Sequence, residues 1–185
     1  MDFDFRWLMA ALGGVAIAAA CGLRAFLPLL VLGIAARFGM FHLGPKAHWL
    51  ESDLALWTLG IAAALEIAGD KIPIVDHALD AIGTFVRPAA ATLAVYATVG
   101  GWPTPWPQIL SLVMGGMALG LHLMKAKVRL TSTATTLGHA NPVLSVAEDA
   151  AAFGASVLAV VLPAVAAALV VALAWIVLRR RRVAA

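Results

Sequence analysis

The stretch AAAFGASVLAVVLPAVAAALVVALAWIVL, residues 150–178, contains 29 consecutive residues without a charged side chain. A helix needs about 20 apolar residues to cross the hydrocarbon core of a bilayer, so this stretch is too long for one simple crossing. Of all 185 residues, 63% are hydrophobic and only 12% are charged, whereas ordinary soluble domains carry roughly twice that charged fraction. The sequence therefore predicts an all-α, polytopic membrane protein and excludes a soluble fold with a polar surface.

The apolar runs predict one transmembrane domain over residues 1–185, with spans near residues 7–36, 54–68, 84–100, 109–124 and 143–178. The first and last runs exceed a single crossing. The last run either bends near Pro163 to make two short crossings, or follows a re-entrant segment formed by the polar stretch 131–136. We therefore expect a helical bundle of five or six crossings with broken or re-entrant helices.

The distribution of basic residues predicts the orientation. Lys125, Lys127, Arg129 and the arginine run 179–182 indicate cytoplasmic segments, because cytoplasmic loops are enriched in Lys and Arg. The uncharged link 101–107, with two tryptophans, is expected outside. The sequence thus predicts a bacterial inner (plasma) membrane protein, with both the N-terminus and the C-terminus cytoplasmic. It contains no basic face with aromatics that would indicate nucleic-acid binding.

Small residues recur at helical spacing, at positions 10, 14, 18 and 22 and again at 116 and 120. Such stripes let helix backbones approach closely within a bilayer. The expected partners are therefore the lipid bilayer and further copies of the chain in a homo-oligomer.

Arg24 is the first charge placed within an apolar run. It lies in GLRAFLP, residues 22–28, where Gly22 and Pro28 favour a helix break. A charged side chain at the centre of a membrane helix costs at least ~2.5 kcal/mol, so it needs a partner or an aqueous path. Two alternatives stay open: Arg24 extends to an interface, or it is buried and paired.

The densest group of charges lies in residues 66–87 and comprises Glu66, Asp70, Lys71, Asp76, His77, Asp80 and Arg87. Glu66 and Asp70 are four residues apart and share a helix face, as do Asp76 and Asp80. The four carboxylates are a candidate metal site, with a divalent cation as the candidate cofactor, or a proton path. The alternative is a solvated loop in which Asp70 pairs with Lys71.

A second polar group consists of Asn141, Glu148 and Asp149, at the start of the last apolar run. Helix capping alone could explain these residues. They are also candidates to compensate Arg24, Arg87 or Lys71. His122, near the end of a span, is a candidate to ligate a metal or relay a proton, although an isolated histidine near a helix end is more often structural.

Four motifs together carry a family resemblance: GLRAFLPLL at 22–30, the segment 66–73 with DKIP, VRP at 86–88, and ANP at 140–142 with SVAED at 145–149. The chain resembles a bacterial integral-membrane family known only as a domain of unknown function, the 4126 family. This resemblance implies a small multi-span inner-membrane protein. The segment EIAGDK, residues 66–71, is also similar to the Glu-x-Gly-Asp-Lys motif of a manganese and calcium transporter family, but has one extra residue after Glu66.

These observations predict a transporter or channel for a small ion, either a cation or a proton, or for a polar solute. Glu66 and Asp70 form the expected ion site, Arg24 and Lys71 are its charge partners, and Arg87, Asn141, Glu148 and Asp149 line the path. One alternative is a metal-dependent enzyme acting on a lipid phosphate through Asp76 and Asp80, although these residues lack the Asp-x-x-Asp-Gly pattern of CDP-alcohol phosphotransferases. The other is a structural or assembly protein whose charges only pair with each other.

Overall fold

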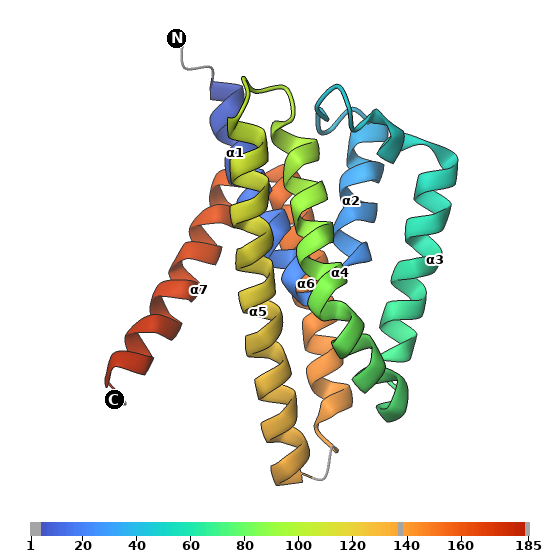
Figure 1. Cartoon of the computed structure of the whole chain (residues 1–185), viewed down its shortest axis with the longest axis vertical. Helices are drawn as coiled ribbons and strands as arrows, with labels where there is room; N and C mark the ends of the chain where they lie inside the picture. Colours follow the sequence, from blue (N-terminus) through green and yellow to red (C-terminus); the bar gives the residue numbers. More distant parts are fainter. Residues whose placement is uncertain (1–4, 137–138, 184–185) are drawn as a thin grey trace.

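The chain is seen here in a computed structural model that describes residues 5–136 and 139–183, with the side chains at 5–6, 73–74, 76–77, 174, 177–178 and 180–183 left out. Within these ranges the structure contains helices and no strands, which confirms the all-α prediction (Figure 1). The elements are α1 (Phe5–Leu23), α2 (Phe26–Arg37), the 3-10 helix η1 (His48–Glu51), α3 (Asp53–Gly69), α4 (Pro73–Val99), α5 (Trp106–Thr136), α6 (Asn141–Val161) and α7 (Pro163–Val183).

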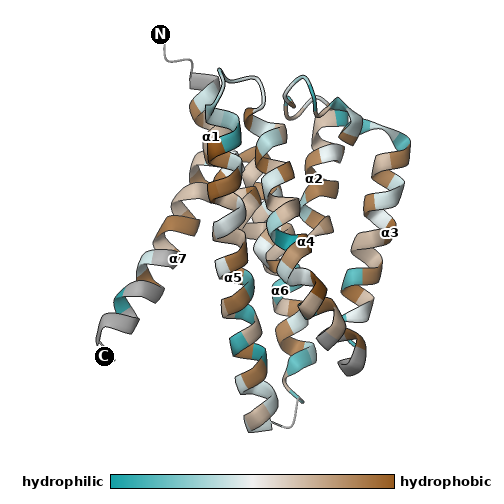
Figure 2. Ribbon diagram, viewed as in Figure 1, coloured by the Kyte–Doolittle hydropathy of each residue, from teal (hydrophilic) through white to brown (hydrophobic). Residues whose placement is uncertain are grey.

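The outer surface of the bundle is apolar. On α3, the side chains of Leu54, Trp57, Ile61 and Leu65 are between 58% and 80% exposed and recur at helical spacing. Figure 2 shows hydrophobic residues over most helices and hydrophilic ones on the second half of α5 and the first turns of α6. Among the described residues, three helical stretches are long and apolar enough to cross a membrane: Ala78–Val99, Trp106–Thr136 and Asn141–Val161. Exposed apolar surface of this extent indicates an integral membrane protein.

The first apolar run is a helical hairpin. Its helices α1 and α2 are separated by Arg24 and Ala25, and the predicted break is therefore present. The ring of Trp7, near the start of α1, stacks on Trp102 with 5.9 Å between the ring centroids. The link after α2 reaches the same end of the bundle, because Gly44 N–H donates to the Ala97 carbonyl at 2.7 Å. We call this the Trp102 end, and the opposite end, which holds the α3–α4 and α5–α6 links, the Ala140 end.

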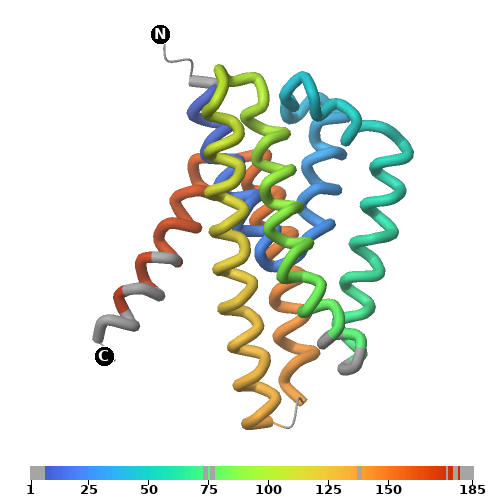
Figure 3. Tube along the Cα trace, in the orientation of Figure 1, coloured from blue at the N-terminus to red at the C-terminus, as the bar shows by residue number. Residues whose placement is uncertain are grey.

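The hairpin changes the expected topology. A run at 7–36 that crossed the membrane once would place the start of α1 and the link after α2 on opposite sides. In the structure both lie at the Trp102 end, because the chain reverses at Arg24 and Ala25 inside the bundle (Figures 1 and 3). Pro28 sits in the first turn of α2, where the missing N–H removes no helical hydrogen bond.

The last apolar run forms a second hairpin of opposite orientation. Helix α6 ends at Val161 and α7 begins at Pro163, so the bend expected near Pro163 is present. This turn lies beside α1, where a Cβ placed on Gly13 would be 3.7 Å from the Cβ of Pro163. From there α7 runs back toward the Ala140 end (Figure 3). The stretch 131–136, considered above as a re-entrant segment, instead continues α5.

Helix α4 also differs from the expectation. It begins at Pro73, so most of the predicted link at residues 69–83 is helical. Proline at the first position of a helix is favoured because its fixed φ suits the helix and its N–H would have no partner. Asp80 and Arg87 consequently lie seven residues apart on one helix and share a face.

The stripe of small residues on α1 packs inside the chain. A Cβ placed on Gly22 would lie 2.9 Å from the backbone oxygen of Ala118 and 2.9 Å from the Cβ of Leu121, both on α5. By contrast, nothing lies within 4 Å of a Cβ placed on Gly116 or Gly120. Close approach of α1 to α5 therefore depends on Gly22.

We expect Gly22→Ala to lower the free energy of unfolding by about 1–3 kcal/mol, because a packed backbone cannot accommodate the added methyl group. Gly120→Ala is the matched control, since it adds the same methyl group to a helix in open space and removes a glycine that is unfavourable by about 1 kcal/mol. Denaturant titration of both variants in detergent micelles measures the two effects. Equal behaviour of the two variants would contradict this packing.

Candidate functional site

Charged side chains from four helices, α3 to α6, meet inside the bundle with others from the α1–α2 turn and the α3–α4 link. Ion pairs of 4.0 Å or less connect them, and Arg24 and Arg87 are at most 1% exposed. We call this set the charged cluster; its described members are five basic residues (Arg24, Lys71, Arg87, Lys125 and Arg129) and five acidic residues (Glu66, Asp70, Asp80, Glu148 and Asp149). The charges of these described members balance.

The cluster is built around the reversal of the chain. The carboxylate of Glu66, on α3, accepts hydrogen bonds from Ala25 N–H at 3.0 Å and Phe26 N–H at 3.3 Å, at the start of α2. The ammonium group of Lys125, on α5, donates to the Leu23 carbonyl at the end of α1 at 3.4 Å. A helix carries partial positive charge at its N-terminus and partial negative charge at its C-terminus, so each helix end faces a side chain of opposite charge.

Arg24 is buried and paired, which resolves the alternatives left open above. Its guanidinium donates to Asp70, lies 2.6 Å from Asp149 and donates to Ser145 Oγ at 3.1 Å. The start of α6 thus supplies a carboxylate for an arginine about 120 residues earlier in the chain. The expectation that Asp149 could compensate Arg24 agrees with this geometry.

Asp70 lies at the C-terminal end of α3, beyond the predicted span 54–68, and joins three basic residues. Besides Arg24, it accepts from Arg129 at 2.8 Å and lies 3.8 Å from the Lys125 ammonium. Asp70 thus joins the end of α3 to the α1–α2 turn and to α5.

Arg87, on α4, connects this helix to α3 through Glu66 and to α5 through His122. Its guanidinium lies 3.6 Å from Glu66 and 3.5 Å from Asp80, and it donates to Nδ1 of His122. Since arginine has no acceptor, Nδ1 carries no proton, and the proton of a neutral ring is at Nε2, which faces the Asp80 carbonyl oxygen at 3.1 Å. His122 thus orients Arg87 and bridges to Asp80.

Three further residues, Lys125, Arg129 and Ser145, belong to the site although the sequence did not predict them there. Lys125 and Arg129 were assigned to a cytoplasmic segment, yet the structure buries both: Lys125 lies 3.0 Å from Glu148, and Arg129 pairs with Glu148 at 2.6 Å. A signal was present, because His122, Lys125 and Arg129 follow an i, i+3, i+7 spacing on one helix face. Lys127, which departs from this spacing, is exposed.

The remaining predicted site residues take different places. Lys71 pairs with Asp149 at 3.1 Å and donates to Ser145 Oγ at 2.9 Å, at the partly exposed edge of the cluster. Asn141 lies one turn before Ser145 and donates to Thr133 Oγ1 at 2.9 Å, so its described contact is with α5 and not with a charged residue.

The candidate metal ligands are dispersed among basic groups. Glu66 and Asp70 form the ion pairs with basic residues described above, and Asp80 lies within 4.0 Å of Arg87 and Lys125. Among the described side chains, no group of three or more His, Cys, Asp or Glu is placed to hold a metal ion. The side chain of Asp76 lies outside the described residues, so a divalent cation at the full set of four carboxylates stays a prediction.

Both the apolar helices and the buried charges define a helical membrane protein with an internal polar centre. Comparison with protein families then places the chain: it belongs to the family described as Domain of unknown function (DUF4126), which it matches over residues 11–182. The resemblance inferred from the sequence motifs is thereby confirmed. Searches of curated proteins and of solved structures gave no match.

Proposed function

We propose that this protein is a transporter or channel for a small ion or polar solute, with a path through the charged cluster. The observation that carries the proposal is the chain reversal at Arg24 and Ala25, where two helix ends and buried charges meet inside the bundle. Broken helices whose ends meet within the membrane form the ion and substrate sites of many transporters. Charges inside a membrane protein are expensive and are retained mostly where they serve such a path.

A proton is the species that fits this site best. The described carboxylates all lie beside basic groups, so an added metal cation would meet positive charge as it approached. A proton meets the same positive charge, but it binds a single carboxylate oxygen and needs no coordination shell. Protonation of Glu66 would weaken both its pair with Arg87 and its hydrogen bonds to the start of α2. Proton binding would thus be linked to the position of the α1–α2 hairpin.

The orientation we propose places the Ala140 end in the cytoplasm of a bacterial cell. Lys127 and the arginine run at 179–182 lie toward this end along the chain, in agreement with the enrichment of basic residues on the cytoplasmic side. Trp7, Trp102 and Trp106 would then lie at the external interface. Because α1 begins at the Trp102 end, this orientation places the start of α1 outside, which revises the expected cytoplasmic N-terminus.

The test is flux into liposomes that contain the purified chain, with gradients of protons, monovalent cations, divalent cations and anions applied in turn. We expect a proton gradient to collapse at least tenfold more slowly with Glu66→Gln than with the unchanged chain, because the amide cannot take up and release a proton. Asp53→Asn is the matched control, since it makes the same chemical change at an exposed carboxylate of the Trp102 end. Equal flux through Glu66→Gln, or no flux under any gradient, would overturn the proposal.

A structural or assembly role is the second candidate, and the balance of five basic and five acidic residues in the described cluster favours it. A cluster that only holds helices together should tolerate neutral replacement of a whole pair. Under this view, a variant with both Arg24 and Asp70 neutralised would support growth as well as the unchanged chain in a strain that requires the protein. Loss of function despite normal folding would exclude it.

A further inference from the structure

A proton that binds Glu66 must travel between water and a buried carboxylate, because the side chain of Glu66 is only 6% exposed. Three other carboxylates of the charged cluster are between 14% and 19% exposed, namely Glu148, Asp80 and Asp149. These three are therefore the candidates to exchange protons with water and to pass them inward.

The bundle is filled with apolar side chains between the charged cluster and the Trp102 end. Ile17 on α1, Leu32 on α2 and Val95 on α4 are at most 1% exposed in this half. Two buried hydroxyl groups there, those of Thr98 and Ser111, donate to carbonyl groups of their own helices at 2.8 and 2.5 Å. The described side chains therefore leave the Ala140 end as the source of protons for the cluster.

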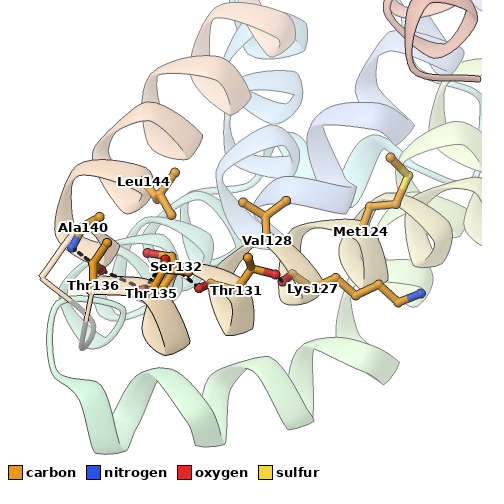
Figure 4. A pocket seen from close by; sticks show the side chains of 9 residues that line it. All are labelled: Met124, Lys127, Val128, Thr131, Ser132, Thr135, Thr136, Ala140 and Leu144. Atoms are coloured by element: carbon orange, nitrogen blue, oxygen red, sulfur yellow. Dashed lines mark hydrogen bonds between the residues drawn. The ribbon is translucent and has the colours of Figure 1, made fainter. Parts of the chain in front are cut away.

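A groove on the outside of the bundle does not lead to the cluster. It lies between the second half of α5 and the start of α6 and has a volume of about 530 Å³. Figure 4 shows its lining, with the ammonium group of Lys127 directed toward Met124. The lining includes none of the described members of the charged cluster, and Lys127 is exposed whereas Lys125 and Arg129 are buried. The groove is therefore no route from water to Glu66.

Two of the three candidate carboxylates are fully engaged. Glu148 accepts hydrogen bonds from Arg129 through both of its oxygens, at 3.2 and 2.6 Å. Asp149 accepts from Lys71 at 3.1 Å through one oxygen, and its other oxygen lies 2.6 Å from the guanidinium of Arg24. A proton on either carboxylate would have to displace a basic group that is already in contact with it.

Asp80 is placed differently. Its Oδ1 is buried and has no hydrogen-bond partner in the described part of the chain, since the guanidinium of Arg87 lies 3.5 Å away and the ammonium group of Lys125 3.9 Å away. The same guanidinium lies 3.6 Å from Glu66, so Asp80 and Glu66 flank one positive charge. Asp80 is also seven residues closer than Arg87 to the start of α4, which lies at the Ala140 end.

The groups that face Asp80 are not suited to carry the proton themselves. Arginine stays protonated in proteins, and neither Arg87 nor a charged Lys125 offers an acceptor. His122 accepts from Arg87 at Nδ1, and its Nε2 faces the Asp80 carbonyl oxygen at 3.1 Å, so both ring nitrogens are occupied. Among the described groups next to Arg87, Asp80 is thus the one with both a free oxygen and partial exposure to water.

We infer that Asp80 carries protons between water at the Ala140 end and Glu66. The carboxylate of Asp80 takes a proton from water at that end. Its O–H bond then breaks while an O–H bond forms on Glu66 through one intervening water molecule, and Asp80 returns to the carboxylate form. Arg87 stabilises whichever of the two carboxylates is ionised. This inference rests on the proposed function, because it supplies protons to the site proposed there.

The experiment measures proton uptake into liposomes that contain the purified full chain. We expect Asp80→Asn to slow uptake at least about tenfold, the lower end of the effect of removing a proton-transfer group. Asp80→Glu keeps a carboxyl group and should recover most of the lost rate. Asp53→Asn makes the same chemical change at an exposed carboxylate of the Trp102 end and should leave the rate unchanged.

Chemical rescue separates proton transfer from a structural role. Formate is a small carboxylate that can replace the missing group of Asp80→Asn, so its addition should restore uptake by this variant. Formic acid also crosses lipid by itself, and Glu66→Gln with the same formate measures that background. Formate should not restore Asp149→Asn, because the carboxylate of Asp149 holds Arg24 in place.

The outcomes distinguish this inference from the proposed function. Proton uptake that Asp80→Asn leaves unchanged, or a gain with formate no larger than the background of Glu66→Gln, would overturn the role of Asp80 alone. A misfolded Asp80→Asn would also give no rescue. Absence of proton uptake by the unchanged chain would overturn the proposed proton path, and the role of Asp80 with it.

Discussion

Arg24→Leu is expected to lower the free energy of unfolding by about 3–5 kcal/mol, the range measured when one partner of a buried ion pair is removed. The loss is large because Arg24 is fully buried and interacts with Asp70 and Asp149 at once. Its removal leaves excess negative charge where water does not reach. Denaturant titration in detergent micelles measures the change.

Two further variants make this prediction specific. Arg37→Leu removes an arginine that also pairs with an aspartate, but that arginine is 46% exposed, so it should cost less than about 1 kcal/mol. Arg24→Leu combined with Asp70→Asn restores charge balance and should recover part of the loss. A cost for Arg24→Leu no larger than that for Arg37→Leu would show that Arg24 is solvated and not held in a buried cluster.

Glu66→Ala is expected to destabilise the chain by a similar amount, about 3–5 kcal/mol. The substitution removes the acceptor for the N–H groups of Ala25 and Phe26 and leaves Arg87 without one of its carboxylates. Glu66→Gln keeps an oxygen acceptor for these N–H groups and should cost at most about half as much, since an unsatisfied buried group carries the larger penalty. This is why the amide variant suits the flux measurement.

Hydrogen exchange provides a readout of Glu66 that stability alone does not. The amide hydrogens of Ala25 and Phe26 should exchange faster in Glu66→Ala than in Glu66→Gln, because only the second retains an acceptor at the start of α2. The exchange of residues in the Trp102 end, such as Gly44, serves as the internal control. Equal costs and equal exchange for the two variants would mean that Glu66 does not hold the hairpin.

The sequence predicted several parts of the fold because each has a local cause. Continuous apolar runs require a lipid environment. Gly22 and Pro28 favour a break around Arg24, and a helix that continued from α6 through Pro163 would lose a backbone hydrogen bond. The charge of Arg24 inside an apolar run also required a partner, and Asp149 was among the candidates. These inferences depend on composition and backbone chemistry over a few residues.

The pairing of the charges could not be derived in the same way. Lys71 follows Asp70 directly in the chain but pairs with Asp149, and Arg24 pairs with Asp70 although 46 residues separate them. Lys125 and Arg129 are basic residues of the kind that mark a cytoplasmic segment, and only the packing of α5 against α1, α4 and α6 turns their side chains inward. Which opposite charges meet depends on helix rotation and register.

The direction of the chain after Arg24 is the clearest example of a feature that the sequence alone does not determine. Local chemistry required a break there, but a broken helix can continue across the membrane or turn back, and both satisfy the backbone within α1 and α2. The reversal is selected by groups far away in the chain: Glu66 at the start of α2, Lys125 at the end of α1, and the stacking of Trp7 on Trp102. Membrane class and helix breaks thus follow from the residues themselves, whereas the hairpin and its charged cluster depend on contacts that exist only when α3, α5 and α6 pack around them.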